Sequence, residues 1–460
     1  MTPMSSPPDP VEVHPPNGRM PALWRSEGVF VANLLGLFFG NEEETRMLAD
    51  EVGEVDSYGG RLLPIIDLLF AGRGRNLLVL EREPDPFLTE FFADRAGLSL
   101  PEIGVLPHRD YLALGARSDW DHEAIERIGS HSAGRIDGYV TDDTLAGIAR
   151  HTGKKTLSTV SGSRTGNNKW LLHRHLEECG LPTPPTEVAE GPGDVRACLD
   201  RLVRAGFRSA AIKAALGASG IGLTKVDDIG AWHEERDAIP EHLFREGPSL
   251  VQGWLRPGER GIMALRSPSV QLFLDDTSVS MFDITEQILS HDSVHEGNES
   301  PPPYLADRPD WRDELLRQAE TAARWLHGRG YRGTASVDFL VTEEETGFTV
   351  YVCEINARVT GATYPSLLAK HFLPEGAWLL RNLRFAAPLS GRDLLDLLSE
   401  AHDLFVPGES EFGVFPVNFN FGSDGLIHKG QFLCLAPSSS GSQELLRIAE
   451  LDLPCAPDRD

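Results

Sequence analysis

The side chains best suited to catalysis lie in two β-rich segments that flank a polar turn, within residues 335–358. A hairpin with its turn centred on Thr346 places Asp338 directly opposite Glu354, with Cβ atoms roughly 5 Å apart. Asn356 falls on the same face because side chains alternate along a strand. Facing carboxylates repel unless a cation lies between them, and two carboxylates with an amide suit Mg²⁺ or Mn²⁺ better than zinc. We therefore predict a metal site here; the alternative is a solvated acidic edge, which apolar residues on the opposite face argue against.

A glycine-rich stretch at residues 217–222 joins two β-like segments. Its glycines let backbone N–H groups approach an anion closely, as in loops that bind phosphate. A strand follows the stretch, so it is neither a Walker A loop nor a dinucleotide-binding turn. The residues that would form the cradle are Gly217, Ser219, Gly220 and Gly222. The alternative is a glycine-rich hairpin turn that binds nothing.

Two lysines stand beside this loop in a chain that has only seven lysines among its 43 Lys and Arg residues. Lys213 lies on the strand that enters the loop, and Lys169 begins a predicted helix at 169–179. The lysine ammonium is a compact point charge suited to a phosphate oxygen, whereas arginine is a planar fork. We predict that both lysines bind phosphate, with chance surface positions as the alternative.

An apolar strand ends within residues 249–255 and is followed by a turn. Backbone groups at such a strand end, here at Gln252, Trp254 and Leu255, can form hydrogen bonds with the edge of an adenine. A carboxylate a few residues later, Glu259, can accept hydrogen bonds from ribose hydroxyls. The alternative is an ordinary strand end followed by a turn.

The composition is that of an acidic globular chain, because 43 Lys and Arg against 69 Asp and Glu give a formal charge of −26. Like charge repels nucleic acid and anionic membrane surfaces, so neither is an expected partner. The five cysteines are scattered without a C-x-x-C pair, which fits a reducing cytoplasm and argues against a disulfide framework or a zinc site. No apolar stretch is long enough to span a bilayer.

Strand–helix alternation from about residue 28 to residue 160 predicts a parallel α/β sheet, and the remainder of the chain has the pattern of an α+β structure. We expect a disordered Pro-rich tail (1–23), an α/β domain (24–165), a central domain (166–385) and a C-terminal domain (386–460). The expected elements are strands at 29–32, 77–80, 103–106, 138–141 and 156–159, helices at 41–52, 169–179, 311–327 and 443–451, and a hairpin of 414–421 with 431–435.

The order and spacing of these groups resemble the ATP-grasp superfamily over about residues 165–385. Residues 353–365, with an α/β domain before and a hairpin domain after, are most similar to the branch of peptide ligases that acts in pheganomycin biosynthesis and its relatives. The resemblance implies a Rossmann-like pre-ATP-grasp domain, a two-lobed ATP-grasp domain with ATP between the lobes, and a small C-terminal α+β domain.

The resemblance also implies a role for each group. It assigns the ATP phosphates to Lys169 and Lys213 beneath a flexible cover at 217–222, the adenine to 252–255 and the ribose to Glu259. The three predicted metal ligands, Asp338, Glu354 and Asn356, would hold Mg²⁺, with Mn²⁺ as an option. The catalytic residues would be Arg358 and Lys213, of which Arg358 steadies the transferred phosphoryl group.

Such an enzyme is an ATP-dependent carboxylate–amine ligase of natural-product biosynthesis. ATP converts an amino-acid-like acid into an acyl phosphate, and the amine of a peptide attacks it to give an amide, ADP and phosphate. This chemistry needs positioning and charge neutralisation but no nucleophilic side chain. A kinase that phosphorylates a small molecule, or a nucleotide-binding protein without activity, is the alternative. The resemblance is also compatible with a homodimer.

Residues 287–304 show no sustained helical or strand period. A structureless loop of this length inside a compact domain is uncommon unless it is functional or disordered. We predict a lid that orders over the site, in which His291 or His295 helps to deprotonate the amine. The alternative is a surface insertion.

Overall fold

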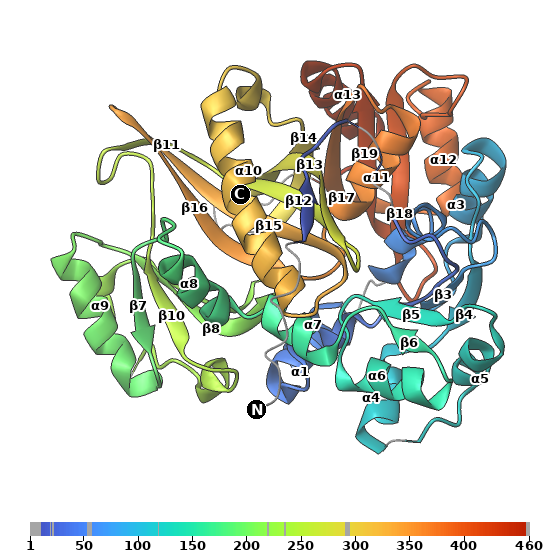
Figure 1. Ribbon diagram of the computed structural model, residues 1–460. Coiled ribbons are helices and arrows are strands. Elements are labelled where there is room, and N and C mark those ends of the chain that lie inside the picture. Colours follow the sequence, from blue (N-terminus) through green and yellow to red (C-terminus); the bar gives the residue numbers. More distant parts are fainter. Residues whose placement is uncertain are drawn as a thin grey trace.

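The computed structural model describes residues 11–456 except 19, 21–22, 53–57, 118, 219, 234–235 and 290–294 (Figure 1). Three sheets organise these residues, and we refer to them as the N-terminal sheet, the small sheet and the large sheet. No helix in these ranges is long and apolar enough to cross a membrane.

The N-terminal sheet is fully parallel, as the alternation of strands and helices predicts. Its order is β4-β3-β2-β5-β6, formed by β2 (Val29–Val31), β3 (Leu77–Leu80), β4 (Glu102–Val105), β5 (Arg135–Gly138) and β6 (Lys155–Thr156). Helices α4 (His108–Arg117), α5 (Glu123–Ser130) and α6 (Asp143–His151) pack beside it (Figure 1).

Strand β5 ends at Gly138, so the prediction of a strand at 138–141 was wrong by about three residues. The cause is a buried side chain: Asn33 accepts a hydrogen bond from Tyr139 N (2.8 Å) and donates one to Val140 O (2.9 Å). These backbone groups therefore have a side-chain partner instead of a neighbouring strand. Asp142 then caps helix α6 by accepting a hydrogen bond from Leu145 N at 2.9 Å.

The small sheet is antiparallel, with the order β7-β10-β8-β9. Its strands are β7 (Thr186–Ala189), β8 (Ala210–Ala218), β9 (Ile221–Val226) and β10 (Ser249–Gly253). Helix α8 (Lys169–Glu178) precedes it where a helix was predicted, and Asn168 caps that helix by accepting from Leu171 N at 2.9 Å. Helix α9 (Val195–Arg204) buries its apolar side in the same core.

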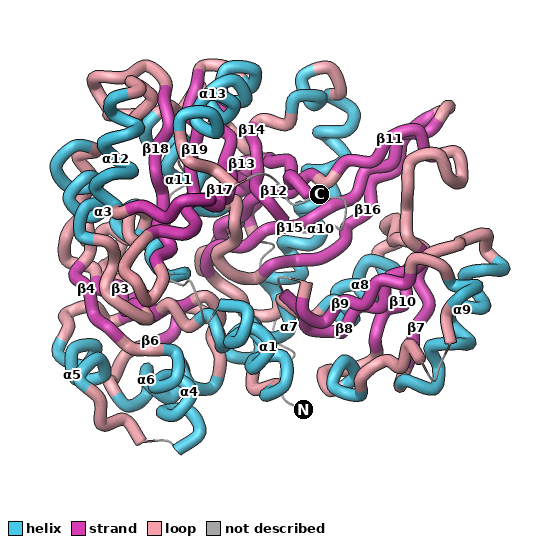
Figure 2. Tube along the Cα trace, turned by 180° about the vertical axis from the view of Figure 1, so that it is seen from behind, coloured by secondary structure: helices cyan, strands magenta, loops and turns pink. Residues whose placement is uncertain are grey.

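The large sheet has ten strands and runs through the centre of the molecule (Figure 2). Its path is β11-β15-β12-β13-β14-β17-β19-β18, with β16 paired to β15 and β1 to β13. The strands are β1 (Glu12–His14), β11 (Ile262–Arg266), β12 (Pro268–Leu274), β13 (Ser278–Leu289), β14 (His295–Ser300), β15 (Gly333–Glu344), β16 (Gly347–Asn356), β17 (Ala377–Leu389), β18 (Gly413–Phe421) and β19 (Ile427–Ala436). The predicted C-terminal hairpin is confirmed as β18 and β19.

Three helices pack against the large sheet: α10 (Pro309–Gly328), α11 (Thr363–Phe372) and α13 (Ser439–Asp452). Helix α12 (Gly391–Glu400) packs against α13 and against α3 (Pro86–Glu90). Helices α10 and α13 confirm the predictions at 311–327 and 443–451, with slightly wider bounds.

The predicted lid is not a structureless loop. Strand β13 continues to Leu289, and β14 pairs with both β13 and β17. The tip of this hairpin, residues 290–294 with His291, lies outside the described residues. The prediction failed because β14 consists mainly of polar residues and lacks the apolar alternation by which a strand is recognised in a sequence. Polar contacts hold this strand in place; Ser300 Oγ, for example, donates to Asp283 Oδ1 at 2.8 Å.

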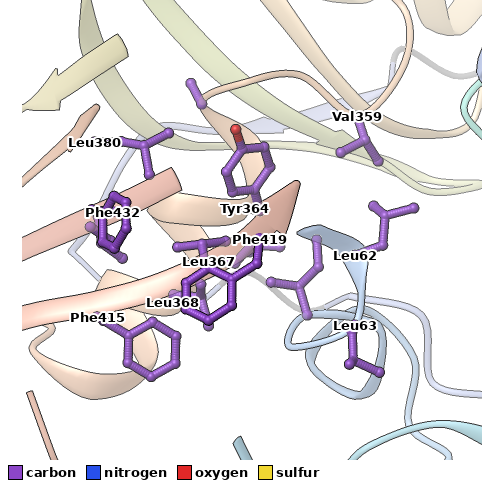
Figure 3. Packing of buried hydrophobic residues seen from close by; sticks show 14 of the residues in the cluster. Leu62, Leu63, Val359, Tyr364, Leu367, Leu368, Leu380, Phe415, Phe419 and Phe432 are labelled. Carbon is purple, nitrogen blue, oxygen red and sulfur yellow. The ribbon is translucent and has the colours of Figure 1, made fainter. Parts of the chain in front are cut away.

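A hydrophobic core joins the N-terminal sheet to the large sheet (Figure 3). Leu62 and Leu63, which follow β2, share this core with Tyr364 and Leu367 of α11 and with Phe415 of β18. Burial of this continuous apolar surface holds the two sheets together.

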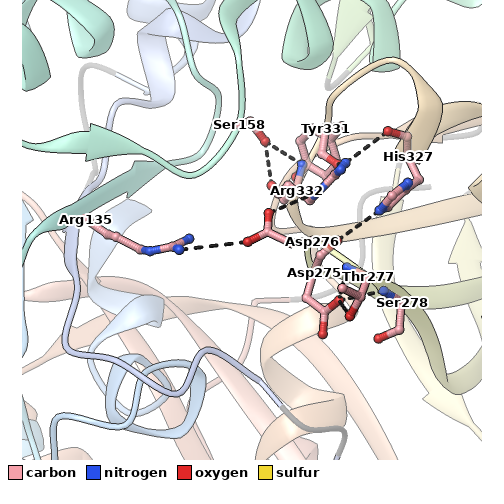
Figure 4. Close-up of polar contacts among 9 residues, drawn as sticks. All are labelled: Arg135, Ser158, Asp275, Asp276, Thr277, Ser278, His327, Tyr331 and Arg332. Carbon is pink, nitrogen blue, oxygen red and sulfur yellow. Dashed lines mark hydrogen bonds and ion pairs between the residues drawn. The ribbon is translucent and has the colours of Figure 1, made fainter. Parts of the chain in front are cut away.

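A polar junction supports the same arrangement (Figure 4). Ser158 Oγ donates to Arg332 O (2.5 Å) and accepts from Arg332 N (2.7 Å). The carboxylate of Asp276 forms ion pairs with the guanidinium groups of Arg332, at 3.5 Å, and Arg135, at 3.9 Å. The loop before β15 and the β12–β13 turn are therefore both fixed to the N-terminal sheet.

Candidate active site

The centre of the candidate site is the β15–β16 hairpin, in which Asp338 pairs with Glu354 as predicted. The reason differs in part from the predicted one. Glu344 pairs with Gly347 and Phe339 with Val352, so the turn is one residue too short to bring Glu354 opposite Asp338. Cys353 is the extra residue of a β-bulge, and this bulge moves Glu354 into the facing position.

Asn356 lies between the two carboxylates. Its Nδ2 donates to Asp338 Oδ2 at 2.8 Å and to Glu354 Oε1 at 3.3 Å. The amide hydrogens thus partly balance the negative charge that a cation would balance more completely.

The two carboxylates have opposite pKa shifts. Desolvation and the charge of Glu354 raise the pKa of Asp338 to about 6, although Ser269 Oγ (2.6 Å) and Ser336 Oγ (3.1 Å) donate to its Oδ1. Desolvation acts in the same direction on Glu354, but Lys169 Nζ lies 2.9 Å from its Oε2 and lowers its pKa to about 2. The site therefore holds one firmly ionised carboxylate and one that is costly to ionise without a cation.

The donor set fits a hard divalent cation. Asp338, Glu354 and Asn356 offer only oxygen ligands once the Asn356 amide turns its oxygen inward. Burial raises the pKa of the neighbouring Cys353 thiol to about 12, so no thiolate competes. Within the described ranges no group of three His, Cys, Asp or Glu side chains gathers to hold a metal. A cation here would need further oxygen ligands, as Mg²⁺ commonly takes from phosphate and water.

The glycine-rich loop and Lys169 meet at this hairpin. Lys169 Nζ donates to Gly217 O at 3.1 Å as well as contacting Glu354. Gly220 and Gly222 both have φ of +83°, a conformation that favours glycine, and a Cβ at Gly217 would lie 2.8 Å from Ile221 O. Ser219 lies outside the described residues. The backbone of the loop therefore requires glycine at three of the four predicted positions, namely Gly217, Gly220 and Gly222.

An apolar segment of the N-terminal region packs on this loop. Leu34, Leu37 and Phe38, from the 3-10 turn Leu34–Phe38 after β2, share a buried cluster with Leu216 and Ile221. The loop is therefore held from outside its own sheet.

Lys213 and the predicted adenine segment lie on neighbouring strands of the small sheet. Lys213 pairs with Leu250, and Gln252 pairs with Ala211. Lys213 is close enough to help lower the pKa of Glu354. Lys213 is thus near both the predicted adenine segment on β10 and Glu354 of the β15–β16 hairpin.

The strand end after β10 is firmly held. Gln252 is buried and its Nε2 donates to Thr186 Oγ1 at 3.0 Å, while Trp254 N donates to Ser209 O at 2.9 Å. Leu255 is buried in the core of the small sheet. Glu259 lies in the turn before β11 and is partly exposed.

Arg358 is oriented by a residue that sequence reasoning missed. Its Nη1 donates to Asn167 Oδ1 at 2.6 Å, and the same oxygen accepts from Ala357 N at 3.1 Å. Desolvation lowers the pKa of Arg358 and the two carboxylates oppose that effect, so the guanidinium stays charged. Ser269 and Ser336 were missed as well, and no sequence signal distinguishes them from other serines.

Residues 166–362 match the family model described as an ATP-grasp domain, so the chain contains an ATP-grasp domain. Among curated proteins, the chain is 27% identical over 300 residues to the [butirosin acyl-carrier protein]–L-glutamate ligase of Niallia circulans. The match covers 65% of this chain and 64% of that protein, so the chain spans less than two thirds of the relative's length.

Solved structures of low identity share the fold. Biotin carboxylase from Campylobacter jejuni superimposes with a TM-score of 0.57 at 14% identity, covering 94% of this chain and 92% of that one. For N5-carboxyaminoimidazole synthetase from Staphylococcus aureus, complexed with ADP, the TM-score is 0.52 at 12% identity, with 94% and 99% covered. For the biotin carboxylase domain of the Hydrogenobacter thermophilus 2-oxoglutarate carboxylase, in complex with MgADP, the TM-score is 0.57 at 15% identity. This match covers 94% of this chain and 90% of that one.

Proposed function

We propose that this chain, an ATP-grasp protein, is an ATP-dependent carboxylate–amine ligase that joins an amino-acid-like acid to the amine of a peptide in natural-product biosynthesis. The observation that carries the proposal is the facing pair Asp338 and Glu354 with Asn356 between them, flanked by Lys169. The name of the Niallia circulans relative, a ligase of an acyl-carrier protein and L-glutamate, supports the ligase class.

In this reaction a carboxylate oxygen of the acid attacks the γ-phosphorus of ATP, and the bond to the bridging oxygen of ADP breaks. The amine then attacks the acyl carbon, phosphate leaves, and the amine loses a proton. When bound, Mg²⁺ supplies charge neutralisation at the phosphates. Lys169, Lys213 and Arg358 add fixed positive charge where negative charge moves, and the glycine loop excludes water from the acyl phosphate.

The amine is proposed to come from a peptide. The relative's name suggests an amine on a carrier protein as a second candidate, since that protein acts on an acyl-carrier protein. A peptide and a carrier protein can be compared directly as acceptors once the acid is known.

Hydroxylamine tests the activity without knowledge of the natural amine, because it traps an acyl phosphate as a hydroxamate. The protein is incubated with ATP, Mg²⁺, hydroxylamine and a panel of acids. A ligase gives hydroxamate, ADP and phosphate in equal amounts. ADP with a stable phosphorylated product and no hydroxamate would support the small-molecule kinase instead. Replacing Mg²⁺ by Mn²⁺ in the same assay tests the second metal.

A further inference from the structure

A chain of hydrogen bonds runs from Asp338 to the segment that follows Arg358. Ser269 Oγ donates to Asp338 Oδ1 at 2.6 Å, and Gln271 Nε2 donates to Ser269 Oγ at 2.9 Å. At the far end, Thr360 Oγ1 donates to Gln271 Oε1 at 3.3 Å. Thr360 lies two residues after Arg358, so the chain of hydrogen bonds connects the predicted metal site with the segment that carries the predicted phosphoryl-binding arginine.

The direction of each hydrogen bond follows from the groups that form it. An ionised carboxylate only accepts, so Ser269 gives its single hydroxyl hydrogen to Asp338 and its oxygen accepts from Gln271. Turning the Gln271 amide over would place its oxygen against the Ser269 oxygen with no hydrogen between them. Gln271 is fully buried, so its own oxygen needs a donor, and Thr360 is the donor within hydrogen-bond distance.

Thr360 is itself held by the start of helix α11. Its N–H donates to Thr363 Oγ1 at 3.0 Å, and its Oγ1 accepts from Ala362 N at 3.4 Å. The two threonine hydroxyls lie 3.1 Å apart. Because Thr360 gives its hydrogen to Gln271, Thr363 is the donor of this pair. Each member of the chain therefore directs a hydrogen towards Asp338, and each hydrogen bond polarises the next.

The strand register explains why these side chains meet. Ser269 and Gln271 are two residues apart on β12, so they share one face of the sheet, and Ser269 pairs with Asp338. Ser336, the second donor to Asp338 Oδ1, pairs with Gln271. Both hydroxyl groups thus contact Oδ1 of the carboxylate. Oδ2, which accepts from Asn356, is left as the oxygen available to a cation.

We propose that Gln271 is a positioning residue of the ligase, which holds the Ser269 hydroxyl as a donor to Asp338 Oδ1 and so fixes the carboxylate oxygen that faces the metal. The inference rests on the proposed function. Without the amide, the Ser269 hydroxyl is free to turn away and the carboxylate loses its fixed orientation. Groups that orient a metal ligand in this way commonly change metal affinity or activity by roughly 10- to 100-fold.

Binding of ADP at graded Mg²⁺ concentrations tests this role without turnover. Gln271→Met keeps the size of the side chain but removes its hydrogen bonds. It is expected to raise the Mg²⁺ concentration for half-maximal ADP binding about tenfold, while ADP affinity in EDTA stays unchanged. Gln318→Met is the matched control, because Gln318 on α10 is also fully buried and its Nε2 donates to Val350 O at 3.0 Å. This control should keep the wild-type Mg²⁺ dependence.

Thr360→Val tests the far end of the chain of hydrogen bonds with a substitution that barely changes the size of a partly exposed side chain. It should raise the Mg²⁺ requirement severalfold. Adding it to Gln271→Met should raise the requirement no further, because both substitutions act through Ser269. The melting temperature of each variant reports that the protein is folded.

An unchanged Mg²⁺ dependence in Gln271→Met, or an equal shift in Gln318→Met, would overturn the proposal, as would additive effects of Gln271→Met and Thr360→Val. If Gln271→Met does not fold, Thr360→Val decides, and wild-type Mg²⁺ dependence in that variant would overturn the proposal. The hydroxamate assay fails independently: no hydroxamate from any acid, together with the expected Mg²⁺ shift, would count against the ligase and not against the role of Gln271.

Discussion

Asp338→Asn should change stability and activity in opposite directions, because the wild-type carboxylate is held in an unfavourable place. Its pKa is raised from 3.8 to about 6 in the metal-free protein. The difference of about two pH units corresponds to about 3 kcal/mol at most, and coupling to Glu354 reduces the expected gain to about 1–2 kcal/mol.

The variant can keep most of the hydrogen-bond network. The oxygen of the introduced amide can still accept from Ser269 and Ser336, and the Asn356 amide can turn over so that its oxygen faces the new NH₂ group. This turn removes the 3.3 Å hydrogen bond from Asn356 Nδ2 to Glu354 Oε1, which is a second reason to expect a gain below about 3 kcal/mol.

The pH dependence has a definite sign. The folded protein binds the Asp338 proton more tightly than the unfolded chain, so the wild type loses stability as pH rises from about 4 to about 6 and the full penalty is present above that range. The variant should melt at a higher temperature than the wild type at pH 8 with EDTA, and this difference should shrink towards pH 4.

With Mg-ATP the order should reverse. Ligand stabilises the folded state according to its affinity, so the wild type should gain more than the variant, which has lost one anion of the predicted metal site. ATP turnover should fall at least 100-fold. Glu345→Gln, in the exposed turn of the same hairpin, is the control and should change neither property. Wild-type-like turnover, or an equal Mg-ATP shift in Asp338→Asn, would refute the metal assignment.

Three further outcomes are expected. Lys213→Arg should lose nearly as much activity as Lys213→Ala, because a planar fork cannot replace a point charge at a phosphate; a near-normal rate in the Arg variant would make the lysine structural. Limited proteolysis should leave 295–300 intact both without ligand and with Mg-ATP plus acid, because β14 pairs with β13 on one side and β17 on the other; cleavage there that slows with ligand would restore the lid. Iodoacetamide should label the exposed Cys179 well before Cys353, whose thiol pKa is raised by burial to about 12, as peptide mass spectrometry can show.

The β15–β16 hairpin could be predicted because its two strands are adjacent in sequence and pair locally. Asp338 and Glu354 needed only a turn between two strands, although the bulge at Cys353 could not be foreseen from strand periodicity. Contacts between residues far apart in the sequence could not be predicted. Asn167 contacts Arg358 across 191 positions, and Ser269 reaches Asp338 only because β12 and β15 are neighbours in the large sheet.

Strand β14 shows a second limit. Sequence patterns recognise strands by apolar alternation, but β14 is held by polar contacts such as that of Ser300 with Asp283.

The apolar contact between the 3-10 turn Leu34–Phe38 and the glycine-rich loop has a thermodynamic consequence for nucleotide exchange. Any motion that lifts the loop from the site must also bring Leu216 and Ile221 out of a shared hydrophobic cluster and into water. Exposure of apolar surface raises the heat capacity. The barrier to nucleotide exchange should therefore have a positive heat capacity of activation, so that the rate of exchange follows a curved Arrhenius plot.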